Sequence, residues 1–320
     1  MAFSVTFPDI EAASLRIRPL VWESPVLQSD RLNERAGREI YFKAESLQRG
    51  GSFKLRGAAN FVRQIGPSDL AAGVVAFSSG NHAQAVAIAA RDAGCKATIV
   101  MPSDAPSVKL NGTRSWGADI VLYDRVNEDR EAVARQVLAE RGGTLIPPFD
   151  HPWIIAGQGT CAYELMQQTS GLDGLLVCLG GGGLLAGCAM AAKAANPAIR
   201  VFGVEPEAAN DGQQSLRRGE RVTIPVPGTI ADGLRTTCVG ANNFPIIQQM
   251  VEDVATVTED EIVEAAGLLL RELRIAVEPS GAVAAAAALF GHIPTEIQRV
   301  GVTLSGGNAE PSFLREILAR

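Results

Sequence analysis

The chain has 320 residues and is 47% hydrophobic and 20% charged, which is typical of a globular protein large enough for two domains. Its formal net charge is -6 and no basic cluster is interleaved with aromatic residues, so we expect no nucleic-acid partner. One uncharged run, 174–192, contains four successive glycines that would break a membrane-spanning helix, so we expect no membrane partner either. The cysteines are odd in number and contain no C-x-x-C pair, which indicates free thiols in a cytoplasmic protein: Cys95, Cys161, Cys178, Cys188 and Cys238.

The N-terminal part of the chain combines short helices with one strand, followed by a glycine-containing loop over 45–51. The apolar periodicity predicts, in order, a helix over 9–16, a helix over 29–36, a strand over 40–43 and a helix that begins near residue 54. Lys54 therefore lies where a loop becomes a helix, with Ser52 as the predicted N-cap. Because the macrodipole disfavours a cation in a first turn, Lys54 is either a solvated side chain or a residue with a special, catalytic role.

Strands alternate with helices through the rest of the chain. The predicted strands cover 74–77, 97–101, 119–122, 144–146, 175–179, 200–204 and 300–304. The predicted helices cover 81–93, 107–116, 128–140, 156–168, 183–195, 212–218, 259–273 and 280–290. This alternation predicts an α/β fold with a parallel sheet, and the long loop over 222–245 is expected to be functional.

Four glycine-rich or polar loops each follow a predicted strand, at 78–82, 180–183, 205–211 and 305–308. Ligands of open parallel sheets bind beyond the carboxyl ends of the strands. We therefore expect the four loops to share one edge of the sheet and to form a single site.

The most distinctive of these loops is a run of glycines between a strand and a helix: Gly180, Gly181, Gly182 and Gly183. Closely approaching backbone N–H groups and a helix N-terminus suit a phosphate, and four glycines exceed what a tight turn alone requires. A dinucleotide site is the alternative, but the G-x-G-x-x-G spacing fails because position 185 is leucine.

The loop over 78–82 joins a strand to a helix, and its hydroxyls and helix-start amides would suit a carboxylate. An ordinary serine–asparagine cap explains it equally well. The acidic loop with Glu205, Glu207 and Asp211 offers oxygen ligands for a metal ion, with a solvated acidic turn as the alternative. The three histidines show no metal-ligand spacing, which argues against zinc.

Taken together, the motifs resemble those of the fold-type II pyridoxal-phosphate (PLP) enzymes, in the threonine/serine dehydratase and serine racemase family. The motifs that carry the resemblance occur in order along nearly the whole chain, at 52–57, 78–82, 157–160, 180–183 and 305–308. The resemblance implies a two-domain fold, with a large PLP-binding domain over 1–72 and 144–320 and a small substrate-binding domain over 73–143.

The resemblance also implies a role for each cofactor residue. Lys54 would form the Schiff base with PLP and move the Cα proton of the substrate, and Phe53 would lie near the cofactor ring. Asn81 would contact the 3-hydroxyl, and the loop 180–183 would hold the phosphate. Ser305 would face the pyridine nitrogen, where a neutral hydroxyl favours elimination. The cofactor then supplies the electron sink, and the protein supplies position and proton transfer.

On the substrate side, the resemblance assigns the amino-acid carboxylate to the loop of Ser78, Ser79, Gly80, Asn81 and His82. Ser79 would lie on the face of the substrate opposite Lys54, which would make racemisation possible beside elimination. Phe149-Asp150-His151-Pro152 resembles the dehydratases more than the animal racemases and favours elimination as the main reaction.

Two arginines leave the substrate open. A second carboxylate, as in 3-hydroxyaspartate, would pair with Arg130 or Arg235, and both residues have an ordinary interpretation as surface arginines. Glu205, the carbonyl of Ala209, and Asp211 match the family's site for Mg2+, with Mn2+ or Ca2+ as alternatives. A homodimer is also expected, and the absence of residues beyond Arg320 favours a catabolic or racemase-type enzyme over one with a regulatory domain.

The sequence therefore predicts a PLP-dependent ammonia-lyase that converts L-serine or L-threonine to a 2-oxo acid and ammonia, with serine racemase as a side activity. A 3-hydroxyaspartate dehydratase is the alternative within the class. A nicotinamide oxidoreductase would require a dinucleotide at the glycine run, and a non-catalytic amino-acid sensor would require an idle Lys54.

Overall fold

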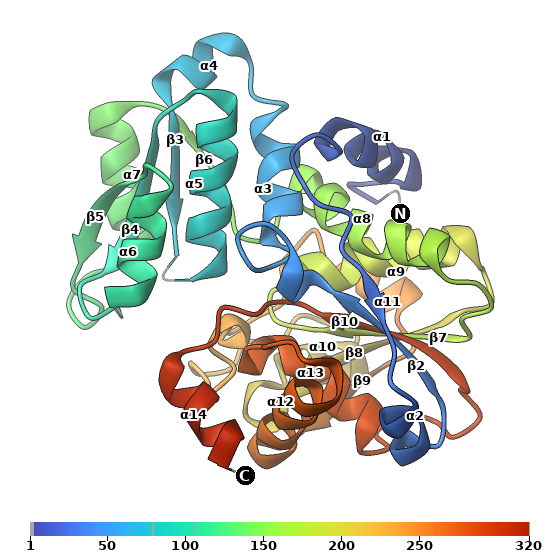
Figure 1. The fold of residues 1–320 in the computed structure, drawn as a ribbon. Helices are drawn as coiled ribbons and strands as arrows, with labels where there is room; N and C mark the ends of the chain where they lie inside the picture. The colour runs from blue at the N-terminus through green and yellow to red at the C-terminus, as the bar shows by residue number, and fades with distance from the viewer. Residues whose placement is uncertain (1–2, 79, 106, 320) are drawn as a thin grey trace.

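The computed structural model describes residues 3–78, 80–105 and 107–319, and it confirms the predicted α/β fold (Figure 1). The strands form two separate sheets, one with six strands in the order β1-β2-β10-β7-β8-β9 and one with four in the order β5-β4-β3-β6. Neighbouring strands are parallel throughout, except for the short β1, which pairs with β2 in antiparallel fashion.

The larger sheet is the centre of the main body. Its strands are β1 (Val26–Leu27), β2 (Glu39–Ala44), β7 (Gly174–Cys178), β8 (Arg200–Pro206), β9 (Asp253–Val257) and β10 (Arg299–Leu304). The helices of this part are α1 (Phe7–Ile17), α2 (Asp30–Ala36), α8 (Pro152–Gln168), α9 (Gly183–Ala195), α10 (Asp211–Arg218), α11 (Phe244–Met250), α12 (Glu259–Leu273), α13 (Pro279–Leu289) and α14 (Pro311–Ala319). Because a parallel sheet is covered on both faces, its central strands are continuous apolar runs, as β7 shows.

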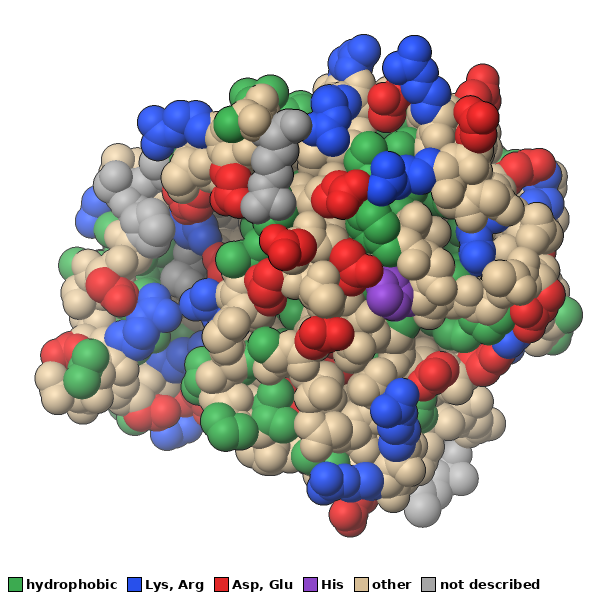
Figure 2. Space-filling model, turned by 90° about the horizontal axis from the view of Figure 1, so that it is seen from below, with side chains coloured by type: hydrophobic (Ala, Val, Ile, Leu, Met, Phe, Trp, Pro, Cys, Tyr) green, Lys and Arg blue, Asp and Glu red, His purple; other side chains and the backbone are tan. Residues whose placement is uncertain are grey.

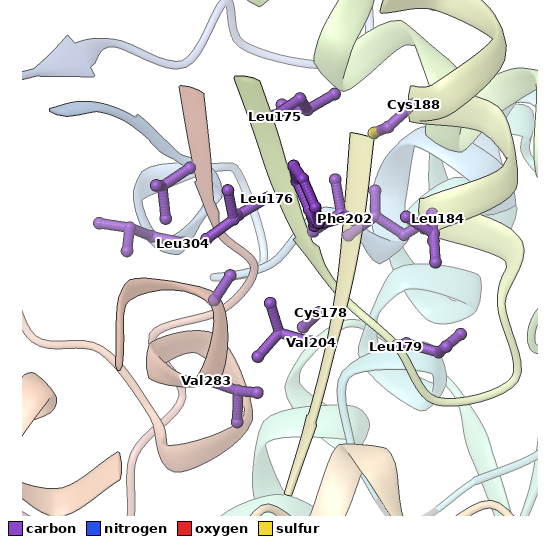
Figure 3. Close-up of a cluster of buried hydrophobic side chains, with 14 of the residues drawn as sticks. Leu175, Leu176, Cys178, Leu179, Leu184, Cys188, Phe202, Val204, Val283 and Leu304 are labelled. Carbon is purple, nitrogen blue, oxygen red and sulfur yellow. The ribbon is translucent and has the colours of Figure 1, made fainter. Parts of the chain in front are cut away.

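Apolar side chains from the strands and their covering helices form one continuous core. Figure 3 shows Leu175 and Leu176 of β7 and Phe202 of β8 together with Leu184 of α9 and Val283 of α13. All five side chains are buried, so their close packing fixes the position of each strand end relative to the covering helices.

The smaller sheet consists of β3 (Val74–Phe77), β4 (Ala97–Pro102), β5 (Asp119–Tyr123) and β6 (Thr144–Leu145). Its helices are α4 (Pro67–Ala72), α5 (Asn81–Ala93), α6 (Ser107–Ser115) and α7 (Arg130–Arg141). Figure 1 shows this unit beside the main body, with α3 (Lys54–Val62) between the two. Strand β6 pairs with β3 of the smaller sheet, although it follows residue 143, where the predicted small domain ends. The division into domains itself stays a prediction.

The glycines of the motif at 157–160 serve close helix packing. A Cβ on Gly157 would lie 2.5 Å from the carbonyl oxygen of Arg56 on α3, and one on Gly159 would lie 2.8 Å from that of Gly187 on α9. Helix α8 therefore contacts both α3 and α9 at distances that only glycine permits.

Several elements of the structure are absent from the sequence-based prediction, namely α4, α11, β9 and α14. Among the described residues, none of the helices is both long and apolar enough to cross a membrane. Figure 2 shows one face of the molecule, on which acidic side chains gather near the middle and Lys and Arg lie mostly around the rim. This face has no continuous basic surface.

A buried set of charges fixes the position of α3. The guanidinium of Arg56 makes paired hydrogen bonds with Glu45, at 2.8 Å each, and with Glu164, at 2.7 Å each. Lys43 of β2 donates to Glu164 at 2.8 Å. Burial alone would raise the pKa of Glu45, but the charge and hydrogen bonds of Arg56, together with Lys43 and Ser24, outweigh it and the pKa is lowered. The side chains of Arg56, Glu45 and Lys43 are fully buried, so these charges depend on one another.

We predict that Arg56→Ala lowers the free energy of unfolding by about 3–5 kcal/mol, because it leaves two carboxylates buried beside a single lysine. The measurement is the urea midpoint of the purified protein. Arg200→Ala is the matched control, since it breaks only the exposed pairs with Glu252 and Glu296 and is expected to cost less than about 1 kcal/mol. Equal losses in the two variants would contradict this role of Arg56.

Candidate active site

The residues around Lys54 are joined to the end of β10 by main-chain contacts. The backbone N–H of Phe53 donates to the carbonyl oxygen of Ser305 at 3.1 Å, and Ser52 forms an isolated antiparallel bridge with Gly306. Phe53 is the N-cap of α3 and makes no side-chain capping bond, so the prediction of Ser52 as N-cap is wrong. The sequence 52–54 is instead held by the loop that follows β10.

The amine of Lys54 points into the protein. Its side chain is half-buried, and Nζ donates to the carbonyl oxygen of Pro148 at 2.8 Å and lies 5.1 Å from the centroid of the Phe53 ring. Burial lowers the pKa of Lys54 to about 8, and nearby Cys178 only partly opposes this shift. An exposed lysine has a pKa of about 10.4, so Lys54 holds far more of the neutral, nucleophilic amine near neutral pH.

The glycine run forms a narrow cradle at the start of α9, with Gly182 as N-cap at φ 93°. A Cβ on Gly181 would lie 2.3 Å from the ring of Phe149. The carbonyl oxygen of Gly181 accepts hydrogen bonds from Asn243 Nδ2 at 2.6 Å and from the backbone of Gly240 at 3.0 Å. With its carbonyl turned into the protein, this loop leaves the helix-start N–H groups for an anion, and a phosphate fits the cradle.

Cys178 lies close to both the glycine run and Lys54. It is buried at the end of β7, two residues before the glycine run, and its electrostatic influence reaches Lys54. Burial raises the pKa of Cys178 to about 11, opposed first by a hydrogen bond with the Ser305 hydroxyl and then by the Lys54 charge. The structure therefore brings Lys54, Ser305 and the glycine run together.

The four loops do not share one sheet edge, which corrects the prediction. Three of them follow β7, β8 and β10 of the larger sheet, whereas 78–82 follows β3 of the smaller sheet. Asn81 nevertheless reaches the site: its Nδ2 donates to Glu278 Oε1 at 2.5 Å, and its Oδ1 accepts from Asn308 Nδ2 at 2.8 Å. The site thus lies between the two sheets.

His82 faces the interior of the smaller unit. Its side chain is buried, and Nε2 lies 3.0 Å from the carbonyl oxygen of Ile146. Burial, and then the charge of Lys54, lower the pKa of His82 to about 3, so the ring is neutral. The Ser78 hydroxyl accepts from the Gly80 backbone at 3.2 Å, and Ser79 lies outside the described residues.

The two arginines predicted for the substrate are both exposed. The guanidinium carbon of Arg130 lies 5.4 Å from the centroid of the Phe77 ring, directly before the 78–82 loop. Arg235 Nε donates at 2.8 Å to the carbonyl oxygen of Thr229, so its guanidinium is bound to its own loop.

The predicted metal ligands lie at the end of β8 and the start of α10. Both oxygens of Glu205 accept backbone hydrogen bonds, from Gly212 and Gln213 at 2.9 Å each. Asp211 is buried, and neither of its carboxylate oxygens has a hydrogen-bond partner in the described part of the chain. Burial raises the pKa of Asp211 to about 7. A buried carboxylate without a partner fits a cation, so these residues are compatible with the expected metal.

Two functional residues escaped the sequence analysis. Glu278 binds Asn81 directly, and Pro148 holds the amine of Lys54. Glu278 stands alone before an alanine-rich helix, and Pro148 contributes only its carbonyl oxygen, so neither belongs to a recognisable cluster. The one available signal for Glu278 was a charged residue at the start of an otherwise apolar segment.

An amine kept partly neutral beside a phosphate cradle is the arrangement needed to hold an aldehyde that carries a phosphate. With the two parallel α/β sheets, this defines the class of fold-type II PLP enzymes. A family model described as "Pyridoxal-phosphate dependent enzyme" matches residues 17–306. The chain belongs to this family, whose cofactor is pyridoxal phosphate.

The chain is similar to several characterised enzymes over nearly its full length. It is 49% identical to the L-threo-3-hydroxyaspartate ammonia-lyase of Saccharomyces cerevisiae and 45% identical to the serine racemase of Schizosaccharomyces pombe, with 95% of this chain and 94% of each relative covered. Among solved structures, maize serine racemase superposes with a TM-score of 0.95 at 38% identity, covering 99% of this chain and 98% of that one.

We predict that His82→Gln removes part of the acid sensitivity of the fold. The pKa of His82 is about 3 in the folded protein and about 6.5 when unfolded, so the unfolded state binds the proton more readily below pH 6.5. Stability from this group is lost as pH falls, by about 1.4 kcal/mol per pH unit. Urea midpoints at pH 7 and about pH 5 measure the slope.

His292→Gln is the control, because His292 is a partly exposed partner of Glu261. It should keep the slope of the natural protein, whereas His82→Gln should flatten it. An unchanged slope in His82→Gln would show that the buried ring does not resist protonation.

Proposed function

We propose that this protein is a PLP-dependent ammonia-lyase that removes the β-hydroxyl of L-serine or L-threonine and releases a 2-oxo acid and ammonia, with serine racemase as a side activity. The observation that carries the proposal is the amine of Lys54, which has a lowered pKa and lies with Ser305 beside the glycine run. The similarity to ammonia-lyases and serine racemases supports it.

In this proposal the residues of the chain bind, orient and transfer a proton. PLP supplies the electron sink at the substrate Cα when it is bound. The glycine run would hold the phosphate, and the neutral Ser305 hydroxyl would serve the pyridine nitrogen. The Nζ of Lys54 would remove the Cα proton of the substrate, since an amine with a pKa of about 8 is a suitable general base.

The choice of substrate rests on residues at the rim of the site. A 3-hydroxyaspartate dehydratase is the second candidate, because Arg130 lies beside the 78–82 loop, where a second carboxylate would reach it. Two relatives named L-threo-3-hydroxyaspartate ammonia-lyase, at 49% and 46% identity, favour this candidate. Arg235 is a weaker partner, since Thr229 already engages its guanidinium. Racemisation through Ser79 and the homodimer rest on the family resemblance, and the cytoplasmic location rests on the pattern of cysteines.

We predict that the purified protein, supplied with PLP, absorbs in the visible range and that Lys54→Ala abolishes this absorbance. Without the lysine amine the cofactor has no covalent attachment, and activity should fall by at least about a thousandfold. Borohydride reduction followed by peptide mass analysis should find the reduced cofactor attached to Lys54. Lys96→Ala, which removes an exposed lysine, is the matched control and should keep both colour and activity.

The reaction is assigned by incubating the holoenzyme with L-serine, D-serine, L-threonine and the 3-hydroxyaspartate diastereomers. Formation of 2-oxo acid and of the opposite enantiomer is measured for each. Fastest oxo-acid release from L-serine or L-threonine supports the main proposal, and fastest release from 3-hydroxyaspartate supports the second candidate. A colourless protein that forms no 2-oxo acid would contradict both the main proposal and the second candidate.

We propose further that Glu205, the Ala209 carbonyl and Asp211 hold Mg2+, with Mn2+ and Ca2+ as alternatives. We predict that Mg2+ raises the melting temperature, because a ligand at about a hundred times its Kd stabilises the folded state by about 2.7 kcal/mol. Asp211→Asn should lose this response. Glu207→Gln removes an exposed acid of the same loop and should keep it. A response that is equal in all three proteins would place the metal elsewhere.

A further inference from the structure

The side-chain amide of Asn81 is held from two sides by residues of the larger sheet. Glu278 Oε1 accepts from Asn81 Nδ2 at 2.5 Å, and Asn308 Nδ2 donates to Asn81 Oδ1 at 2.8 Å. Asn308 is itself oriented, because its Nδ2 also donates to the carbonyl oxygen of Gly50 at 2.9 Å. A flipped Asn81 amide would place two N–H donors against each other and an oxygen against a carboxylate.

One N–H of Asn81 is left after these contacts. The Nδ2 group carries two hydrogens, and the described hydrogen bonds use one of them, toward Glu278. Asn81 is half-buried at the start of α5, next to the site, so the second N–H is available for an acceptor there. The phenolic oxygen of PLP is such an acceptor.

Glu278 itself has little freedom. It is 6% exposed, it precedes Pro279 at the start of α13, and its backbone N–H donates to the carbonyl oxygen of Gly306 at 3.1 Å. A Cβ on Gly306 would lie 2.1 Å from Glu278 Oε1, so the carboxylate passes directly over the loop that carries Ser305. This close passage fixes the carboxylate relative to the cofactor residues.

The charged groups facing Glu278 come from two further elements. Asp232, in the 3-10 helix Asp232–Leu234, repels it, and Lys109 of α6 attracts it. Lys109 Nζ donates to Asp232 Oδ2 at 2.5 Å, which is a further contact between the smaller unit and the main body. Burial and then Asp232 raise the pKa of Glu278 to about 7, so its hydrogen bond with Asn81 is the main direct compensation for burying this carboxylate.

We propose that Glu278 is a positioning residue for the cofactor: with Asn308 it fixes the Asn81 amide, across the gap between the two sheets, so that an N–H faces the phenolic oxygen of PLP. The inference rests on the proposed function, in which Asn81 contacts that oxygen. Because Asn81 belongs to the smaller unit and both partners to the main body, the amide is set only while the two units are together. Glu278 thus links their closure to the cofactor.

The test measures the Kd for PLP and the visible absorbance spectrum of the holoenzyme for Glu278→Ala, Glu278→Gln, Asn308→Ala and Asn81→Ala. Loss of one oriented hydrogen bond predicts about tenfold weaker PLP binding in Glu278→Ala and in Asn308→Ala, with an altered spectrum. Glu278→Gln keeps an acceptor oxygen without the charge and should restore both properties. In the Asn81→Ala background, neither change should have a further effect.

Glu310→Gln is the matched control, since it removes an acid near Lys109 without touching Asn81. The inference is overturned if Glu278→Ala and Asn308→Ala bind PLP like the natural protein. It is also overturned if Glu278→Ala and Asn308→Ala weaken PLP binding by the same factor in the Asn81→Ala background. The same holds if Glu278→Gln binds PLP as weakly as Glu278→Ala. In each case Lys54-dependent colour in the natural protein would leave the proposed function standing, whereas its absence there would remove the proposed function itself.

Discussion

The buried ion pairs of Arg56 fix the position of α3, the helix that begins at Lys54. Buried charges are tolerable only when each one meets a partner, so these ion pairs fix how β2, α8 and α3 pack together. Arg56 is two residues from Lys54 on the same helix. The position of the amine is thus decided by contacts that lie behind the active site.

The site has one fixed wall and one wall that is supplied by another unit. On the fixed side, Phe53 and Ser305 are joined through the backbone, and the glycines of α8 let three helices pack without intervening side chains. The other wall is Asn81, whose anchoring partners Glu278 and Asn308 belong to the main body. In a site built in this way, Lys54 and the glycine run belong to one body, and only the Asn81 side depends on contacts between the two units.

The sequence was sufficient for most elements, because helices and strands with a strong apolar period reveal themselves locally. It also pointed to Lys54 and the glycine run as candidates, because their residue types are tied to a chemistry or a backbone geometry, and their roles stay predictions. It failed for Ser52, which a long-range bridge to Gly306 removes from its capping role. The prediction that four loops share one sheet edge also failed, because tertiary packing decides which strands form which sheet. Glu278 was missed because its partner, Asn81, is distant in the chain.

Burial shifts the pKa values of several groups in the candidate site in the direction of their uncharged forms. Burial lowers the pKa of Lys54 and of His82 and raises those of Cys178 and Glu278, and Ser305 is neutral by nature. An amine with a pKa of about 8 can both accept and release a proton near neutral pH, which suits a residue that would remove the Cα proton of an amino-acid substrate.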